Sequence, residues 1–213
     1  MIVINQIKTI KEKLRIYEKP FIESSFLQNL LEKFAPHYTI AQLCSRELII
    51  PIKKGKIYLN TERDRKKVLL GTTIIAQYFQ NNSYYAVWWI ELYNRYGYTT
   101  QVANKITVYN RFVSWEKTIA QMQFIFKKER ESFFYGVEKI DAQWYGTYNQ
   151  LSRERALLQL LKDTKGQREF SEEIYDLIKN RIINLELLWD LAKKYTSHST
   201  QVLLQDFLKR WKI

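Results

Sequence analysis

The stretch HYTIAQLCSRELI at residues 37–49 runs directly into IPIKKGKIYL at residues 50–59, and these two segments decide the fold of the amino-terminal part. The first has helical spacing, and the second indicates two short apolar strands around a Lys-Lys-Gly-Lys turn. A helix followed by a basic hairpin is typical of a DNA-recognition helix with its wing. We therefore predict a helix that enters a major groove and a hairpin that contacts phosphates.

The predicted helix has two faces, because residues three and four apart point the same way. Its apolar face consists of Ile40, Leu43, Cys44 and Leu48. Its polar face carries side chains that donate to phosphate oxygens or read base edges, namely Tyr38, Thr39, Gln42, Ser45 and Arg46. Among these, we expect Thr39, Gln42 and Arg46 to be the main readers.

The predicted hairpin turns at Gly55, which supplies the positive φ angle that a tight turn favours. Such a turn would expose Lys53, Lys54 and Lys56 together as phosphate anchors. An alternative interpretation is an ordinary amphipathic helix and hairpin, whose charges only solvate a surface.

Two further helices precede this segment. The apolar spacing of Ile4, Ile7, Ile10, Leu14 and Tyr17 predicts the first, which ends before Pro20. Ser24 or Ser25 is expected to cap the second, which carries Phe26, Leu27, Leu30, Leu31 and Phe34. The order helix, helix, recognition helix and wing predicts a winged helix-turn-helix DNA-binding domain over residues 1–61.

The charge of the chain agrees with a polyanionic partner. The 213 residues carry a formal net charge of +12, of which +7 falls within residues 1–67. A positive field steers a protein toward nucleic acid and makes binding sensitive to salt, although an anionic membrane would attract it as well. No window approaches the roughly 20 apolar residues of a spanning helix, and the amino terminus lacks a signal-peptide pattern. We expect a cytoplasmic protein without a membrane partner.

The single cysteine, Cys44, excludes an internal disulfide framework. Its position on the apolar face of the predicted helix indicates a small buried side chain rather than a nucleophile.

Residues 62–213 are expected to form a mixed α/β domain that ends in a helical tail, so the chain as a whole is predicted to be α+β. Its charged start, ERDRKK at residues 62–67, marks the boundary. Helical spacing over 66–80 and 84–96 gives way to strand-like alternation at 105–109 and 122–126, and residues 133–150 continue as strands with turns at Gly136 and Gly146. Helices are then predicted over residues 152–162, 171–181, 184–195 and 200–211.

Two segments in this second region, read after a winged helix, resemble the AbiEi antitoxin family of abortive-infection, type IV toxin–antitoxin systems. The first is YYAVWWIELYNRYGYTTQ at residues 84–101, which matches the family pattern at Trp88, Trp89, Leu92, Gly97, Thr99 and Gln101. The second is LSRERALLQLL at residues 151–161, which matches at Ser152, Glu154, Arg155, Ala156, Leu157 and Leu158. The chain departs from the pattern at Ile90, Glu91 and Gln159, where the family often has Ser, Ala and Asp.

This resemblance implies a two-part protein. The winged helix would repress its own operon by binding double-stranded promoter DNA, and the carboxy-terminal domain would counter a nucleotidyltransferase-like toxin, with or without a stable complex.

From the residues themselves, the aromatic side chains of the first motif and the leucines of the second are expected to pack in the core. Ser152 is expected to be an N-cap. The exposed candidates for antitoxin activity are then Arg95, Arg153, Glu154 and Arg155.

The sequence shows no catalytic constellation, and we predict neither an enzyme nor a cofactor or metal site. His37 and His198 are far apart and lack metal-ligand spacing, and no phosphate-binding glycine loop or nucleophile elbow is present. Two alternatives to an antitoxin and autorepressor stay open. One is a free-standing regulator or protein-binding adaptor, and the other is a metal-dependent nuclease that uses Glu138, Asp141 and Glu154.

Overall fold

The structure is a computed structural model that describes residues 2–17, 20–60, 70–80, 82–88, 90–98, 105–141, 146–163, 171–194 and 198–210. It is a mixed α+β protein, as predicted. Its contacts divide the chain into two units, residues 1–80 with 118–121 and residues 81–117 with 122–213. The predicted boundary segment, residues 62–67, lies outside the described residues, and the first unit extends beyond it to Gln80.

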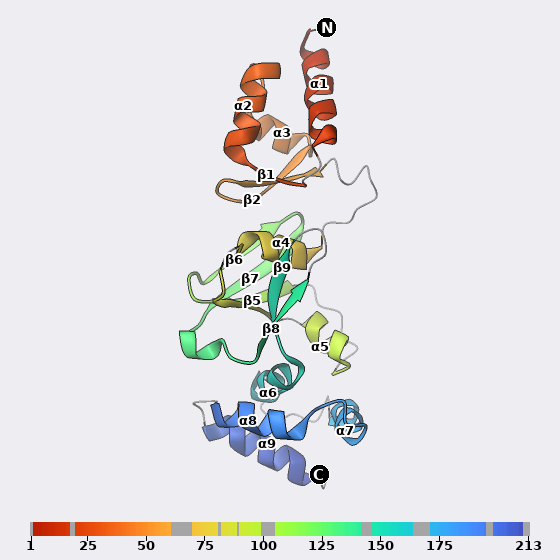
Figure 1. Cartoon of the computed structure of the whole chain (residues 1–213), viewed down its shortest axis with the longest axis vertical. Helices are drawn as coiled ribbons and strands as arrows, with labels where there is room; N and C mark the ends of the chain where they lie inside the picture. The colour runs from red at the N-terminus through yellow and green to blue at the C-terminus, as the bar shows by residue number, and fades with distance from the viewer. Residues whose placement is uncertain are drawn as a thin grey trace. The chain divides into compact units, whose positions relative to one another are not determined.

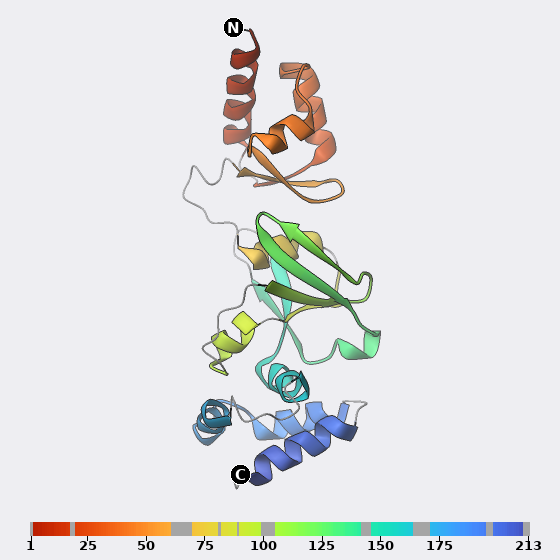
Figure 2. The same ribbon diagram turned by 180° about the vertical axis from the view of Figure 1, so that it is seen from behind.

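The first unit begins with helix α1 (Ile2–Ile16), strand β1 (Phe21–Glu23), helix α2 (Ser24–Phe34) and helix α3 (Ile40–Ser45). Strands β2 (Ile49–Lys53) and β3 (Lys56–Leu59) follow, and helix α4 (Gly71–Tyr78) completes the unit. The strands form an antiparallel sheet in the order β1-β3-β2, and Figures 1 and 2 show α1, α2 and α3 on one of its faces. Strand β1 is absent from the sequence prediction.

The apolar spacing of the helices builds the core of this unit. Ile10 and Leu14 of α1, Leu27 of α2 and Leu43 of α3 are fully buried in it. The N-cap of α2 is Glu23, whose side chain makes no capping hydrogen bond, so the predicted cap at Ser24 or Ser25 is wrong. Glu23 is the last residue of β1, and the chain therefore enters α2 directly from a strand.

The second unit contains a six-stranded mixed sheet in the order β6-β7-β5-β4-β9-β8, except for residues 118–119 at the end of β6, which the contacts assign to the first unit. Its strands are β4 (Tyr85–Trp88), β5 (Lys105–Asn110), β6 (Trp115–Ile119), β7 (Met122–Lys128), β8 (Val137–Asp141) and β9 (Thr147–Leu151). Strand β4 pairs antiparallel with β5 and parallel with β9, whereas β5 and β7 run parallel. The short 3-10 helix η2 (Glu131–Phe133) follows β7.

Residues 84–96 do not form the single helix predicted from their spacing. Tyr85–Trp88 is a central strand because it pairs on both sides, and helix α5 (Ile90–Tyr96) begins only after it. Leu92 is buried as predicted, whereas Trp88 is half-buried and donates from its indole nitrogen to the Tyr93 hydroxyl. Trp89, Thr99 and Gln101 of the motif lie outside the described residues.

Gly97 ends helix α5 in a left-handed conformation, with φ of 77°. The N–H of Gly97 donates to the Asn94 carbonyl and the N–H of Tyr98 to the Tyr93 carbonyl, at 2.9 and 2.8 Å. This pair of bonds is a Schellman motif, and the rings of Tyr93 and Tyr98 supply its usual apolar contact.

Helix α6 (Arg153–Asp163) is the centre of the helical tail. Every residue from Glu154 to Leu161 is buried, because α5, α8 (Leu185–Lys194) and α9 (His198–Arg210) all contact this helix. Both views in Figures 1 and 2 place α6 between the sheet and the pair α8 and α9. Ser152 is its N-cap, as predicted, since its Oγ accepts from the Arg155 N–H at 3.3 Å. Helix α7 (Ser171–Lys179) precedes α8 in the chain.

Candidate functional site

Helix α3 starts with a capping box. The side chain of Thr39 accepts from the N–H of Gln42, and the side chain of Gln42 accepts from the N–H of Thr39 at 2.9 Å. The pattern Thr-x-x-Gln satisfies two helix-end donors that would otherwise lack partners. Two side chains predicted to read bases therefore also hold the first turn of the helix.

The carboxyl end of α3 is equally well defined, so the helix is shorter than the segment predicted from its spacing. Glu47 adopts a left-handed φ of 55°, and its N–H donates to the Cys44 carbonyl. The side chain of Asn60 donates to the carbonyl of Glu47 at 2.6 Å. Asn60 thereby ties the residue after β3 to the end of α3, which fixes the helix against the hairpin.

The polar face of α3 is only partly as predicted. Thr39, Gln42 and Arg46 are exposed on it. Tyr38 is only 8% exposed and belongs to the core, so its placement on the polar face is wrong. The guanidinium of Arg46 lies 5.6 Å from the centre of the Tyr38 ring. The tyrosine is therefore a platform for the arginine rather than a contact residue itself.

The hairpin turns at Gly55, whose φ of 83° confirms the predicted conformation. Its three lysines are not exposed together, which corrects the prediction. Lys54 is exposed at the tip. Lys56 pairs with Glu23 at 3.0 Å and has a side chain only 14% exposed, and Lys53 donates to the Tyr78 carbonyl at 2.7 Å.

The half-buried position of Lys53 affects its charge. Burial lowers the pKa of its ammonium group, and the positive charge of Lys56, its cross-strand partner, lowers it further against the opposing effect of Glu23. Two like charges placed opposite each other in a sheet repel. Because Lys53 and Lys56 are both engaged within the protein, the exposed Lys54 is the residue of the hairpin best placed to meet a polyanion.

Cys44 lies at the edge of the core of the first unit, partly buried, as its position on the apolar face predicted. Burial raises the pKa of its thiol, which disfavours the reactive thiolate form.

Two of the four candidates in the second unit are buried and cannot form an exposed surface. Arg155 has no exposed area, and its guanidinium lies 4.7 Å from the ring centres of both Phe133 and Tyr135. Glu154 is 8% exposed, and its carboxylate accepts from the N–H of Asn184 at 3.0 Å. These side chains tie α6 to its neighbours, and their predicted exposure is wrong.

The other two candidates, Arg95 and Arg153, flank a polar network between α5 and β9. Arg95 donates to the hydroxyl of Tyr148 at 3.0 Å and to Gln150 at 3.3 Å. The guanidinium of Arg153 lies 5.3 Å from the ring centre of Tyr96. Tyr96 donates to the Leu151 carbonyl, accepts from Gln150, and has a pKa raised well above its usual value, mainly by burial. The tyrosine therefore stays protonated at neutral pH and acts here as a structural donor.

The three carboxylates considered for a nuclease do not form a common metal site. No group of three or more His, Cys, Asp or Glu side chains within the described residues could hold a metal ion, and Glu138, Asp141 and Glu154 form none. Partial burial of its carboxyl and the nearby charge of Glu154 raise the pKa of Glu138.

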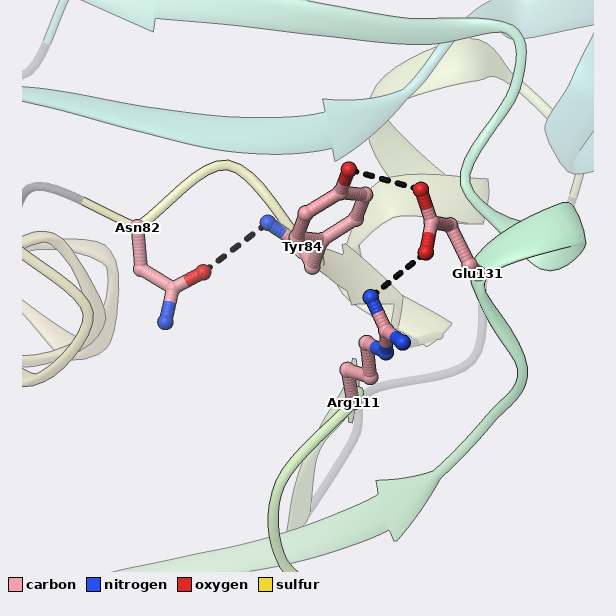
Figure 3. Close-up of polar contacts among 4 residues, drawn as sticks. All are labelled: Asn82, Tyr84, Arg111 and Glu131. Carbon is pink, nitrogen blue, oxygen red and sulfur yellow. Dashed lines mark hydrogen bonds and ion pairs between the residues drawn. The ribbon is translucent and has the colours of Figure 1, made fainter.

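A second polar cluster was not predicted and comes from segments far apart in the chain (Figure 3). Glu131, the first residue of η2, accepts from the Tyr84 hydroxyl at 2.7 Å and forms an ion pair with Arg111. The Arg111 guanidinium also lies 5.3 Å from the Tyr84 ring centre. The hydrogen bond to Glu131 and its negative charge raise the pKa of Tyr84. The spacing of these residues along the chain gives no signal that they meet.

The fold and these contacts define an α+β protein. Its first unit exposes the polar face of helix α3 and the turn of the β2–β3 hairpin. No known protein-family model matches the chain, and no curated protein does. None of the described helices is both long and apolar enough to cross a membrane.

The contribution of the capping box to stability can be tested by substitution. Replacing Thr39 by alanine removes the N-cap acceptor and is expected to lower the free energy of unfolding by about 1 kcal/mol. Replacing Gln42 by glutamate should leave it unchanged, because glutamate serves equally well at this position of a capping box. Urea denaturation followed by circular dichroism measures both. If Gln42→Glu lowered the free energy of unfolding as much as Thr39→Ala does, Gln42 would stabilise the helix in a way other than capping.

Proposed function

We propose that the protein binds double-stranded DNA through helix α3 and the β2–β3 hairpin of a winged helix-turn-helix domain. The observation that carries this proposal is the row of exposed polar side chains, Thr39, Gln42 and Arg46, on a helix whose opposite face is buried. Side chains of these types hydrogen-bond base edges and phosphates, and recognition helices contact bases through their first turns.

The connectivity of the first unit supports the same proposal. A strand lies between α1 and α2, and it pairs with the second strand of the hairpin, so that three helices and a three-stranded sheet share one core. The edge strand β2 carries Pro51 next to a break in its register, a position where the missing N–H of proline is tolerated. The hairpin is thus tied to the helices, and Lys54 projects from its turn.

We further propose that DNA binding serves autorepression of a toxin–antitoxin operon, and that the second unit counters a nucleotidyltransferase-like toxin. Support for this step comes from the resemblance of residues 84–101 and 151–161 to the AbiEi family. The burial of Leu157 and Leu158 is consistent with a packing role for the second motif. The proposal includes no catalytic activity.

A gel-shift assay with DNA from upstream of the protein's own gene tests the DNA-binding proposal. We expect saturable binding that is tighter than binding to a scrambled sequence and that weakens steeply with salt, because counterions are released from the phosphates. The variant Gln42→Glu should bind this DNA more weakly, since it keeps the cap but replaces an amide donor by a negative charge. Equal affinity for the two DNA sequences would contradict sequence-specific repression.

Co-expression tests the antitoxin role. Growth should be restored when the full-length protein is produced together with a nucleotidyltransferase toxin encoded beside its gene. A protein that is folded and abundant in the cells but fails to restore growth would exclude this role and leave DNA binding unaffected.

A further inference from the structure

The second unit has a cavity of about 540 Å³ where strands β5 and β7 end. It is lined by Arg111, Lys128, Glu129, Arg130 and Glu131. The two strands run parallel, with Asn110 opposite Lys128, so the segments that follow them leave the sheet at the same edge. Arg111, which follows β5, and the continuous segment 128–131 at the end of β7 thus form one basic cavity.

Asn110 fixes the backbone around this cavity. Its side chain is fully buried and accepts from the N–H groups of Phe112 and Val113, both at 2.8 Å. Its amide donates to the Val113 carbonyl at 3.0 Å, and its own carbonyl accepts from the N–H of Glu129 at 2.8 Å. The loops on both sides of the cavity are therefore held by a single buried residue, and the site is largely formed in advance.

The charges of the lining residues favour an anion. Arg111 is oriented by Glu131 and by the Tyr84 ring, as Figure 3 shows, yet 47% of its side chain is exposed. One carboxylate can occupy only part of the five-donor guanidinium fork, which leaves donors for a second acceptor. Lys128 and Arg130 are exposed beside it. Three cations and two carboxylates, one of them paired, leave a net positive cavity.

We infer that this cavity binds the phosphate groups of a small ligand of nucleotide size. Its volume lies within the range of roughly 300–1,000 Å³ that is usual for small-molecule sites. Arginine and lysine together are the side chains that recognise phosphate, arginine through its planar donors and lysine as a point charge. The site lies in the second unit and is independent of the helix and hairpin proposed to bind DNA.

Calorimetric titration of the full-length protein with tripolyphosphate tests this inference, with adenosine as the ligand that lacks phosphate. We expect saturable binding of tripolyphosphate and none of adenosine. The double variant Lys128→Gln with Arg130→Gln should bind tripolyphosphate at least tenfold more weakly. Neither substitution touches the Arg111–Glu131 ion pair, so circular dichroism should show an unchanged fold.

Two control variants separate this site from general attraction to a basic protein. Lys139→Gln with Lys209→Gln removes the same charge from exposed positions on β8 and α9 and should leave the affinity unchanged. Lys54→Ala, in the hairpin, should leave it unchanged too, even if DNA binding fails. Absence of saturable tripolyphosphate binding, or an equal loss in the two double variants, would overturn the inference.

Discussion

Replacing Gly136 by alanine is expected to lower the free energy of unfolding by about 3 kcal/mol, the largest effect on stability that we predict. Gly136 has a φ of 59°, a left-handed conformation that costs a residue with a Cβ about 1–2 kcal/mol. An added Cβ would also lie 3.0 Å from Cβ of Arg155 and 3.1 Å from a methyl group of Leu191. The Cβ of Arg155 cannot move easily, because it is attached to the backbone of the buried helix α6, and the Gly136 carbonyl is held by the N–H of Ser152.

Gly146 offers a matched control for this substitution. Its φ is 90°, but no atom of the described residues lies within 4 Å of the position of an added Cβ. Gly146→Ala should therefore show the conformational cost alone, and the difference between the two variants should isolate the steric overlap with Arg155 and Leu191. Urea denaturation of the two full-length variants measures this difference. Equal losses would show that the packing around Gly136 relaxes without cost.

Local patterns predicted the elements that depend on local interactions. The spacing of apolar residues predicted α1, α2 and α6 to within a few residues, and Ser152 was correctly identified as a cap because capping is decided within one helical turn. The pattern Thr39-x-x-Gln42 is also the signature of a capping box, a local signal that the prediction of both residues as base readers does not use.

Elements that depend on distant pairing were missed or mistaken. Strand β1 has only three residues, too few for alternation to be visible, and it forms because Phe21 lies opposite Tyr58 on β3. Tyr85–Trp88 was predicted as helix and is a strand because β5 and β9 pair with it on both sides. Here tertiary pairing outweighs the local helical spacing.

The candidate site residues also divide into those whose surroundings a local pattern predicts and those whose surroundings depend on distant segments. Helical spacing placed Arg46, and the turn at Gly55 placed Lys54, on exposed surface correctly, but neither pattern could show that a charged residue would be covered by a distant segment. Arg155 is buried against Phe133 and Tyr135, and Lys56 is paired with Glu23. In both cases the partner lies 20 or more residues away, so the sequence offered no local sign of the contact.

Helix α3 and the β2–β3 hairpin, which we propose to bind DNA, are expected to respond differently to substitution. Arg46→Ala should weaken binding to the upstream DNA by roughly 10- to 100-fold while changing binding to scrambled DNA little, because an arginine that reads a base edge contributes about 1–3 kcal/mol of discrimination. Lys54→Ala should weaken binding to both sequences alike and reduce the slope of log K against log[salt] by about 1, the value for one lost phosphate contact. Fluorescence anisotropy at several salt concentrations measures both quantities.

The other two lysines of the hairpin provide the controls, because they are already engaged within the protein. Lys53 donates to the Tyr78 carbonyl and Lys56 pairs with Glu23, so each substitution to alanine should change the salt slope less than Lys54→Ala does. Circular dichroism should accompany these measurements, since loss of either contact affects the packing around the hairpin. Equal effects of all three lysines would contradict the assignment of Lys54 as the main phosphate contact. Identical behaviour of Arg46→Ala and Lys54→Ala would remove the distinction between a reading helix and an anchoring hairpin.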